Sequence, residues 1–295
     1  MTDFRHGLVL AALLLSACGQ RALEPDAAIA CDQCDRWNQP QDPFRVHGNT
    51  WYVGTVGLSS ILIEADDGLI LIDGGLPQSA ALIDANVRSL GFDTRDIKAI
   101  LVSHVHYDHV GGISALQRLT GANVFTSAAG SGPLALGVLA DDDPQYIAGS
   151  DRGHFPPVRE VVAVEDDGVV SVGTLDVRAV YTPGHAPGSI TWTWQSCALG
   201  ACYDVVYADS LSAVSAQGFR FTDSGVADKL IASAGIIADL DCDILLTPHP
   251  FFFGMDAKLE QRDRGNPFIN KLGCVLYAES SMDWLEQRLQ AERSH

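Results

Sequence analysis

The segment SHVHYDH at residues 103–109 constrains this chain more than any other part of its sequence. It follows a short apolar run that is typical of a buried strand. Residues two apart on an extended backbone point to the same side, so we expect His104 and His106 to lie together, with Asp108 and His109 following where the chain turns. Three imidazoles and a carboxylate this close are costly to bury unless a cation holds them. Nitrogen and carboxylate ligands in such a cluster favour zinc.

Two further histidines stand just after predicted strands. His185 lies in TPGHAPG at 182–188, and His249 lies in LTPHP at 246–250. In both segments prolines restrict the backbone, and catalytic groups commonly sit on loops that a rigid sheet anchors. We therefore expect His185 and His249 to join the histidine cluster, which brings five of the nine histidines of the chain into one site.

Residues 1–17 have the pattern of a signal peptide. Arg5 precedes an apolar run at 8–15, which is too short to cross a bilayer, and the run ends in Leu-Ser-Ala-Cys at 15–18. This ending resembles a bacterial lipobox, in which Cys18 becomes the lipid-bearing N-terminus. The alternative is ordinary cleavage near Ala17. Either way we expect an exported protein in the periplasm of a Gram-negative bacterium, with membrane attachment only through a lipidated Cys18.

The composition excludes one class of partner. The chain has 295 residues, is 47% hydrophobic and carries a formal net charge of −18. Its length and apolar content are sufficient for a large core, and an acidic surface repels phosphate backbones, so we expect no nucleic-acid partner. We expect a monomer. The short acidic run at 141–143 is expected to be the solvated tip of a loop.

Periodicity and turn residues predict a mixed α/β fold. Residues 18–45, with three prolines, are expected to form a tether and an irregular lead-in, and 46–295 a single catalytic domain. The segment 141–157 reads as a long loop, which is uncommon unless it covers a site. Two strand-rich halves, each closed by helices, predict two mixed sheets packed face to face with helices outside. Strands are expected at 51–54, 59–64, 69–72, 97–103, 123–126, 158–164, 169–172, 175–181, 189–195, 204–208 and 243–247, and helices at 79–90, 110–119, 226–240 and 271–292.

Export permits disulfides, and six cysteines remain after Cys18. Six cysteines allow 15 pairings. Local spacing favours Cys197–Cys202 across a hairpin turn, and Cys242–Cys274 would tie a strand to the last helix. Cys31 and Cys34 are then left for each other, although a CxxC pair is also the pattern of a redox or zinc half-site.

The HxHxDH motif, with a later PGH and a later PH, resembles the metallo-β-lactamase superfamily. Further segments are similar to subclass B3 metallo-β-lactamases. HxHxDH alone indicates only the superfamily, whereas the segment Ala-Asp-Ser-Leu-Ser at 208–212 makes the likeness to the subclass more specific. The resemblance covers most of the chain after the leader at 1–17 and implies an αβ/βα four-layer sandwich with metals at one edge. It also supports the pairs Cys197–Cys202 and Cys242–Cys274. The similar segments are GNTWYVGT at 48–55, IDGG at 72–75, TPGH at 182–185, ITWTW at 190–194, YADSLS at 207–212 and LTPHP at 246–250.

The resemblance implies two Zn²⁺ per chain, each with three protein ligands. The ligands implied for the first zinc are His104, His106 and His185. Those implied for the second are Asp108, His109 and His249.

The resemblance also implies roles around the metals. Ser210 stands where another subclass has a cysteine ligand, so we expect it not to bind metal. Ser210 and Ser212 are expected to bind the substrate carboxylate, and Gln145 is a further expected substrate contact, with a plain loop role as the alternative. Asp73 looks like the family's buried aspartate, which orients the metal-binding loop from behind.

The implied activity is hydrolysis of the β-lactam ring of antibiotics, which are small-molecule substrates. Zinc can lower the pKa of a bound water from about 16 to about 7, so a hydroxide held between the metals would attack the carbonyl. Asp108 would hold that hydroxide in line as the catalytic carboxylate. The chain contains neither the Gly-x-Ser-x-Gly nor the Ser-x-x-Lys motif of serine hydrolases.

Two rival functions differ from this one in a testable feature. A lactonase or thioesterase on the same scaffold often has an aspartate that bridges both metals, and Asp209 is the only candidate at that place. A zinc-storing lipoprotein without activity would have a closed site, whereas six ligands shared by two metals leave open positions.

A run of three phenylalanines at 251–253 follows His249 directly. It is more apolar than expected beside such a site. The run either packs as core or lines the pocket and alters which substrates fit.

Overall fold

The computed structural model describes residues 22–294, so the expectations for the leader and for Cys18 lie outside the described residues. Within that range no helix combines the length and the apolar character needed to cross a membrane.

A seven-stranded sheet forms the first half of the fold, with its strands in chain order from β1 to β7. Neighbours pair antiparallel up to β4 and parallel from β4 onward. Asp66 and Asp67 form the two-residue turn between β3 and β4. The strands are β1 (Phe44–His47), β2 (Thr50–Tyr52), β3 (Ile61–Ala65), β4 (Gly68–Ile72), β5 (Ile97–Leu101), β6 (Asn123–Thr126) and β7 (Val161–Ala163).

A five-stranded sheet forms the second half, in the order β12-β11-β10-β9-β8. Its pairs are antiparallel except β11 with β12, which run parallel. The strands are β8 (Val169–Val172), β9 (Leu175–Tyr181), β10 (Ile190–Ala198), β11 (Ala201–Tyr207) and β12 (Ile244–Leu246).

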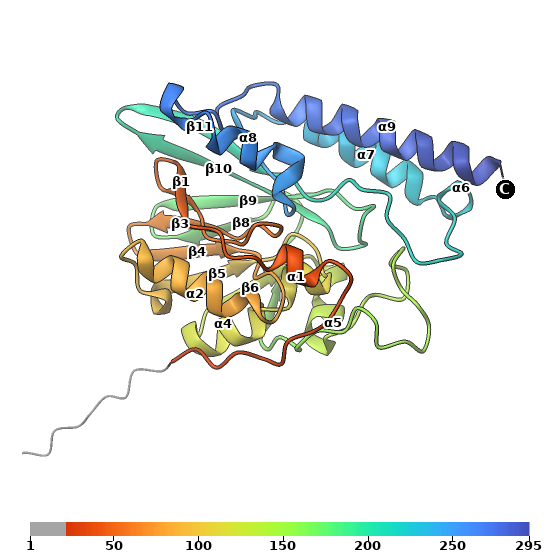
Figure 1. Ribbon diagram of the computed structural model, residues 1–295, viewed down its shortest axis with the longest axis horizontal. Coiled ribbons are helices and arrows are strands. Elements are labelled where there is room, and N and C mark those ends of the chain that lie inside the picture. The colour runs from red at the N-terminus through yellow and green to blue at the C-terminus, as the bar shows by residue number, and fades with distance from the viewer. Residues whose placement is uncertain (1–21, 295) are drawn as a thin grey trace, which may run out of the picture.

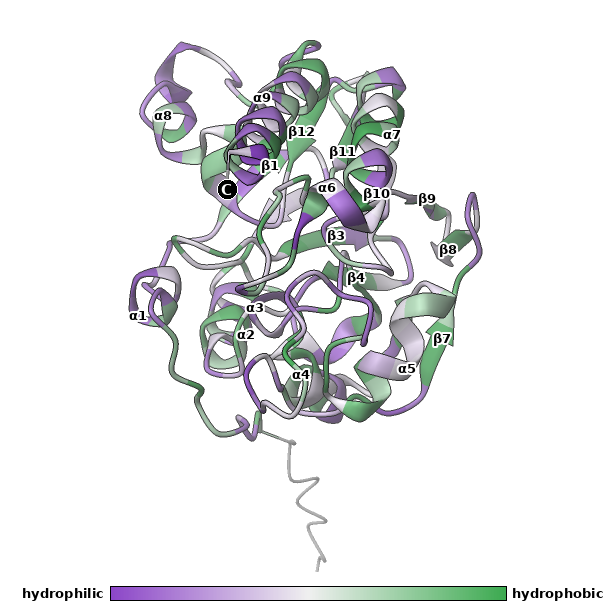
Figure 2. Ribbon diagram, turned by 90° about the vertical axis from the view of Figure 1, so that its right-hand side faces the viewer, coloured by the Kyte–Doolittle hydropathy of each residue, from purple (hydrophilic) through white to green (hydrophobic). Residues whose placement is uncertain are grey.

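Helices cover the outer face of each sheet. Figures 1 and 2 show α2 and α4 below the first sheet and α7 and α9 above the second, so that four layers stack in the order helix, sheet, sheet, helix. This confirms the predicted α/β sandwich. The longer helices are α2 (Ser79–Ser89), α4 (Ile113–Thr120), α5 (Ala128–Leu136), α7 (Val226–Asp239) and α9 (Gly273–Arg293); the shorter ones are α1 (Cys34–Trp37), α3 (Tyr107–Val110), α6 (Phe221–Ser224), α8 (Met255–Leu259) and the 3-10 turns η1 (Thr94–Asp96), η2 (Pro250–Phe253) and η3 (Arg262–Arg264).

Strand β4 shows how the layers pack. Ile70 and Ile72 point into the core between the sheets, whereas Leu69 and Leu71 point to the core beneath α2 and α4. All four side chains are buried, because a sheet covered on both faces has no solvent side. The apolar run in the sequence is therefore the signature of a central strand.

The two sheets are joined by hydrogen bonds at one edge. The backbone N–H of Ile190 donates to the carbonyl of Ser103 at 2.7 Å. The indole Nε1–H of Trp192 donates to the carbonyl of Val102 at 3.0 Å, and both groups are buried. These bonds place the end of β5 beside the start of β10.

Three disulfides form in the described chain. Cys197–Cys202 closes the β10–β11 hairpin and Cys242–Cys274 ties the segment before β12 to α9, as predicted. Cys31 bonds to Cys34 at the start of α1, which leaves no free thiol there for a zinc half-site.

The helix predicted at 110–119 is divided into α3 and α4. A Cβ at Gly112 would lie 2.3 Å from the carbonyl oxygen of Gly74, so the chain turns tightly against the loop after β4. The sequence analysis missed several elements, among them β1, α5 and the short helices α1, α6 and α8. Strand β1 begins inside the expected lead-in, and α5 contains Pro133 and two glycines, which disfavour a helix. Its N-cap, Ser127, accepts a hydrogen bond from Gly130 and starts the helix in spite of that composition.

The lead-in is held against the first half of the fold. The backbone of Ile29 exchanges two hydrogen bonds with the side chain of Gln78, at 3.2 and 3.0 Å. Cys34 and Trp37 of α1 pack with Leu58 in a small apolar cluster. The described part of this segment is therefore a fixed component of the domain rather than a free tether.

The carboxylate of Glu292 connects the end of α9 to α6. It accepts hydrogen bonds from the backbone N–H groups of Phe221 and Thr222, at 3.1 and 3.0 Å, and from Arg288 Nε at 2.6 Å. Burial opposes ionisation, but these bonds outweigh it and lower the pKa of Glu292 to about 2. Because the folded chain releases this proton more readily than the unfolded chain, the stabilisation is present above the ordinary carboxyl pKa and is lost as the pH falls toward 2.

Glu292→Ala should lower the free energy of unfolding by about 2 kcal/mol at pH 7, because it removes charge-assisted hydrogen bonds from two backbone donors. Urea denaturation of the variant and of wild type would measure the loss. Glu279→Ala is the control, since Glu279 is exposed on the same helix. The difference between Glu292→Ala and wild type should narrow between pH 4.5 and pH 2.5; a difference independent of pH would contradict the assigned pKa shift.

Candidate metal centre

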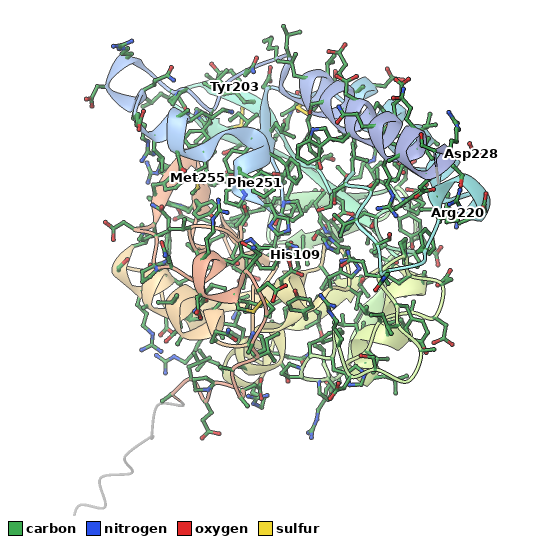
Figure 3. All side chains as sticks on the ribbon, turned by 45° about the vertical axis from the view of Figure 1, so that its right-hand side comes forward. His109, Tyr203, Arg220, Asp228, Phe251 and Met255 are labelled. Carbon is green, nitrogen blue, oxygen red and sulfur yellow. A yellow bond between two sulfur atoms is a disulfide. The ribbon has the colours of Figure 1, made fainter. Side chains whose placement is uncertain are left out.

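The predicted ligands converge where strands of both sheets end. His104, His106, Asp108 and His109 follow β5, His185 follows β9, and His249 follows β12. Figure 3 shows His109 near the centre of the molecule, between the two halves. The site is therefore assembled from three loops that only the sandwich brings together.

The six side chains form two groups of three. Within the group His104, His106 and His185, and within the group Asp108, His109 and His249, one ligand atom of each residue lies within 4.8 Å of the others. His104 and His109 have ring centroids 4.3 Å apart, so the two groups adjoin. Each group offers three ligand atoms to one ion.

Local backbone geometry explains how one short segment serves both groups. His106 is the extended N-cap of α3, with φ −116° and ψ 149°, so His104 and His106 precede the helix on an extended stretch. Asp108 and His109 lie in the first turn of α3, and their side chains belong to the second group, with His249. The carbonyl of His109 accepts a hydrogen bond from the N–H of Gly74 at 2.7 Å, which ties this turn to the loop after β4.

Each imidazole of the first group has its other nitrogen occupied. His104 Nδ1 lies 2.7 Å from Asp209 Oδ1, and His106 Nε2 lies 2.8 Å from Asp143 Oδ2. His185 Nδ1 donates to the carbonyl of Ser212 at 2.9 Å. A hydrogen bond at one ring nitrogen fixes the tautomer and leaves the other nitrogen with its lone pair free for a metal.

In the second group, His249 is the one imidazole that has such a hydrogen bond among the described residues. His249 Nδ1 donates to the carbonyl of Gly57 at 3.1 Å. Asp108 Oδ2 lies 3.3 Å from His109 Nε2 and 3.5 Å from His249 Nε2. Burial alone would raise the pKa of Asp108, but the adjacent histidines outweigh it and hold that pKa well below its ordinary range. Asp108 is therefore ionised at neutral pH.

The donor set fits two zinc ions. His104 Nε2 and both ring nitrogens of His109 are buried and have no hydrogen-bond partner among the described residues, an arrangement that costs free energy unless a ligand satisfies it. Burial lowers the pKa values of His185 and His249 to about 4, so both imidazoles are neutral and able to coordinate. Five imidazoles with one carboxylate, and no thiolate, are ligands that zinc prefers.

Asp73 holds the metal-binding segment from behind. Its carboxylate accepts hydrogen bonds from the N–H and the hydroxyl of Ser103, at 2.8 and 2.7 Å, and from the hydroxyl of Tyr207 at 2.8 Å. Its Oδ2 lies 3.8 Å from His109 Nδ1. Asp73 itself adopts φ +58°, a strained conformation for a residue with a side chain. Asp73 belongs to neither three-residue group; its role is to orient the segment that carries the histidines.

Asp209 lies behind His104 and belongs to neither three-residue group. Its backbone N–H donates to Thr191 Oγ1 at 3.1 Å, and burial raises the pKa of its carboxyl. In this position the carboxylate orients His104, whereas a lactonase or thioesterase would need it between the two metals. Sequence reasoning identified Asp209 only as a possible bridging ligand and missed its contact with His104.

The expectation that residues 141–143 are a solvated loop tip was wrong for Asp143. Its side chain is buried, with 4% of the residue exposed, and it is the partner of His106. Asp141 and Asp142 are exposed, as predicted. No local signal separates the third aspartate from its two neighbours, because the difference arises from the fold of the loop over the histidine cluster.

The residues expected to contact substrate lie close to the first group. Gln145 Nε2 is 3.3 Å from His106 Nδ1, the nitrogen that remains for a metal. Ser212 Oγ is 3.1 Å from His185 Nδ1, on the side away from a metal. Ser210 is only 1% exposed, and its hydroxyl has no partner within the described chain. Of Gln145, Ser210 and Ser212, Gln145 therefore has the most direct access to the nitrogen that remains for a metal.

Two aromatic side chains flank His249. The ring centroid of Trp37 lies 5.2 Å from that of His249, and Phe251 lies 5.6 Å from it on another side. Of the phenylalanine run, Phe253 is core and Phe251 is 58% exposed, so the run both packs and lines the site. Trp37 was missed by sequence reasoning, because nothing in the proline-rich lead-in links it to a histidine more than 200 residues away.

Comparison with known proteins agrees with this geometry. Residues 53–249 match the metallo-β-lactamase superfamily. The chain is 42% identical to the solved structure of MEM-A1, a subclass B3 metallo-β-lactamase from a soil metagenome library, over 88% of this chain and 99% of that one, with a TM-score of 0.84. It is 43% identical to the metallo-β-lactamase SMB-1 in complex with mercaptoacetic acid, over 87% of this chain and 99% of that one, with a TM-score of 0.83. A hydroxyacylglutathione hydrolase of Maricaulis maris is 30% identical over 112 residues, which are 38% of this chain and 35% of that relative.

Asp143→Asn should lower the zinc affinity of the first group by about 10-fold, because the amide accepts the hydrogen bond from His106 without the negative charge. Titration of the metal-free protein with zinc against a chelating indicator would measure it. Asp142→Asn makes the same chemical change at the adjacent, exposed position and should leave the affinity unchanged. Equal affinities for the two variants would contradict the role given to Asp143.

Proposed function

The chain belongs to the metallo-β-lactamase superfamily, and from that premise we propose that it hydrolyses the β-lactam ring of antibiotics with two zinc ions. We assign His104, His106 and His185 to one ion and Asp108, His109 and His249 to the other. Hydrolysis of this bond confers resistance to the antibiotic.

The observation that carries the proposal is the pair of adjoining three-residue groups. A structural zinc site is closed by four protein ligands, whereas each group here supplies three. An ion bound by either group retains an open position for water or substrate. This favours catalysis over zinc storage.

Two observations favour a β-lactam over a lactone or thioester. The likeness to MEM-A1 and SMB-1 extends over nearly the whole of those enzymes, whereas the likeness to a hydroxyacylglutathione hydrolase covers 35% of that protein. In addition, Asp209 Oδ1 contacts His104 Nδ1, and Asp209 belongs to neither three-residue group.

The chemistry divides between metal and protein. Zinc at these positions supplies a Lewis acid and a water of lowered pKa. Asp108, ionised and only 6% exposed, accepts a hydrogen bond from the attacking water and keeps it aimed at the carbonyl carbon. Addition of water breaks the ring C–N bond, and the ring nitrogen takes up a proton. Asp73, Asp143 and Asp209 hold the histidines without touching the reacting atoms.

Substrate contacts are assigned by position. Gln145 lies at the open face of His106 and is placed to donate to a polar group of the substrate. Ser212 and Ser210 follow β11 at the same edge, and we assign to them the carboxylate that β-lactam antibiotics carry. Ser210 would reach it through a bridging water, since its own hydroxyl is buried.

We also propose that the protein is a periplasmic monomer. A signal peptide at 1–17 and a lipid on Cys18 would supply export and attachment. Three disulfides in the described chain support an oxidising compartment.

The mature chain with zinc should hydrolyse a carbapenem and a chromogenic cephalosporin. Absorbance of the β-lactam ring would follow the reaction. Dipicolinic acid should abolish turnover and added zinc should restore it, because in the proposed mechanism the nucleophile is a water activated by zinc. Zinc-loaded protein that hydrolyses neither compound, while cleaving a lactone or a thioester, would reject the proposal in favour of that substrate class.

Asp108→Asn should retain the fold and lower kcat by at least about 100-fold, because the amide neither carries the charge nor accepts the water proton. Steady-state kinetics together with zinc analysis would test this, with circular dichroism as the check on folding. Near-normal kcat in a variant that holds two zincs would rule out the role assigned to Asp108.

A further inference from the structure

Arg288, near the C-terminal end of α9, binds the chain that leads from β11 to α6. Its guanidinium donates hydrogen bonds to the carbonyl of Ala213 at 3.4 Å, to the hydroxyl of Ser215 at 2.9 Å and to the carbonyl of Phe219 at 3.1 Å. These acceptors lie within residues 213–219, which form neither helix nor strand. One side chain therefore bonds to an irregular segment at both of its ends.

The guanidinium is itself fixed from two sides. Its Nε–H donates to Glu292 Oε1 at 2.6 Å, one turn further along α9, and its Cζ lies 5.0 Å from the centre of the Phe221 ring in α6. A planar guanidinium presents five N–H donors in fixed directions, whereas a lysine ammonium is a single point of charge. Several acceptors spread around one side chain therefore require arginine at position 288.

Besides Arg288, segment 213–219 has one hydrogen-bond partner elsewhere in the described chain. The N–H of Ala216 donates to the carbonyl of Pro144 at 2.8 Å. Pro144 belongs to the long loop, and Figure 1 shows the chain from β11 to α6 passing between that loop and the helices α6 and α9. The segment thus connects α9 to the long loop.

The long loop has few other anchors. Its residues 140–154 form hydrogen bonds to the rest of the described chain at two places. One is the carbonyl of Pro144, and the other is the ring of His106, which Asp143 and Gln145 contact. Because Pro144 stands between these two residues in the sequence, its bond fixes the backbone from which both side chains reach the imidazole.

The start of segment 213–219 adjoins the first ligand group. The carbonyl of Ser212 accepts a hydrogen bond from His185 Nδ1 at 2.9 Å, and Ser212 Oγ lies 3.1 Å from the same nitrogen. Ala213, whose carbonyl accepts from Arg288, is the next residue. Arg288 donates to none of the six proposed metal ligands, so its influence on them passes through the two loops.

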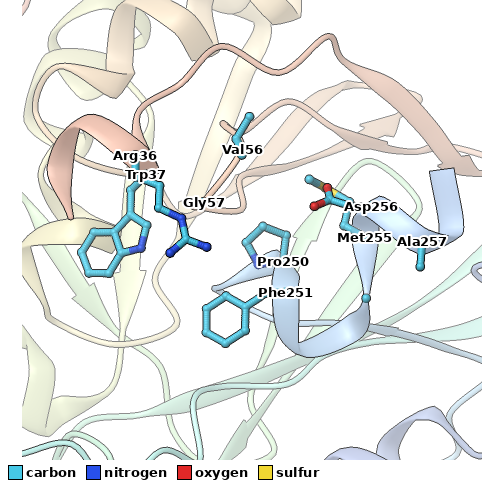
Figure 4. Close-up of a pocket in the computed structure, with 10 residues that line it drawn as sticks. Arg36, Trp37, Val56, Gly57, Pro250, Phe251, Met255, Asp256 and Ala257 are labelled. Carbon is cyan, nitrogen blue, oxygen red and sulfur yellow. The ribbon is translucent and has the colours of Figure 1, made fainter. Parts of the chain in front are cut away.

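The second ligand group is bordered by other parts of the chain. The carbonyl of Gly57 orients His249, and Trp37 and Phe251, which line the cavity in Figure 4, flank its ring. In the described chain, Arg288 and the segment that it binds form no hydrogen bond with these residues. The influence of Arg288 is therefore confined to the side of the site where the first group lies.

We propose that Arg288 is a positioning residue for the hydrolysis proposed above, on which this inference rests. Through segment 213–219 it fixes both loops that border the first ligand group, and so orders the expected substrate contacts Gln145 and Ser212 in advance. Contacts that are ordered before binding cost less free energy when the substrate arrives. Without the guanidinium the substrate has to order both loops, and the loss falls on KM because the zinc ligands keep their other supports.

Arg288→Lys retains the positive charge beside Glu292 and removes the fixed set of donors. We expect KM for a chromogenic cephalosporin to rise about fivefold, with kcat within about twofold of wild type and zinc content unchanged. Arg293→Lys makes the same change at an exposed position of the same helix and should leave KM and kcat unchanged. Ser215→Ala removes one acceptor and leaves α9 intact, and it should raise KM about twofold.

The division between KM and kcat distinguishes positioning from stability. A variant that is only less stable contains less folded enzyme, so its kcat falls while its KM stays constant. That result for Arg288→Lys, or an unchanged KM in both Arg288→Lys and Ser215→Ala, would overturn the positioning role and leave the proposed function intact.

Hydrogen–deuterium exchange of the zinc-loaded protein, followed by mass spectrometry, does not depend on turnover. Peptides that cover 140–154 and 213–219 should exchange at least about threefold faster in Arg288→Lys than in wild type or Arg293→Lys, with peptides of β4 and β5 unchanged. Unchanged exchange in both loops would overturn the positioning role whether or not β-lactams are hydrolysed. Wild type that hydrolyses no β-lactam would overturn the proposed function, and faster exchange of the two loops would then still support their dependence on Arg288.

Discussion

The carboxylate of Asp73 joins the two sheets directly beneath the metal-binding segment. It receives two hydrogen bonds from Ser103, at the end of β5, and one from Tyr207, at the end of β11. The pKa of Asp73 is raised to about 6, because burial raises it by more than nearby His109 and these hydrogen bonds lower it. Without these hydrogen bonds the buried carboxylate would destabilise the interior. The bonds offset the cost of the left-handed backbone conformation of Asp73. This side chain therefore links the end of β5, where the histidine segment begins, to the end of β11.

The ligands share a common arrangement. His104 is oriented by Asp209 and His185 by the carbonyl of Ser212, both from the loop after β11. His106 is oriented by Asp143 from the long loop, and His249 by a carbonyl of the loop after β2. Every orienting group comes from a different part of the chain than the ligand it holds. Folding and metal binding are coupled as a result, since the ligand geometry exists only when both sheets are in place. Among the described residues, His104 Nε2 and both ring nitrogens of His109 have no hydrogen-bond partner, so the protein by itself does not satisfy them.

The lead-in takes part in the site, although its sequence resembles a linker. Backbone hydrogen bonds to Gln78 and Gly57 fix it, the Cys31–Cys34 bond closes its turn, and Trp37 is thereby held against His249. Together with Phe251 it gives the second ligand group an aromatic border that the first group lacks. The two ends of the site therefore differ in character: Gln145 and serines lie near the first group, and aromatic rings lie beside His249 of the second.

Local sequence was sufficient to predict most of the strands, the longer helices other than α5, and the six candidate ligands. The apolar runs predicted the central strands because a strand covered on both faces has no polar side, and HxHxDH predicted a metal site because imidazoles two apart on an extended chain face one another. The tertiary structure alone decided which polar groups orient those ligands. Asp143 and Asp142 are the same residue type on adjacent positions of one loop, yet only Asp143 is folded under against His106. Asp209 likewise required the stacking of the two sheets to come behind His104, and Trp37 required the lead-in to pack beside a loop near the other end of the chain. These contacts depend on the close packing of segments distant in sequence, and no local pattern of residue types encodes such packing.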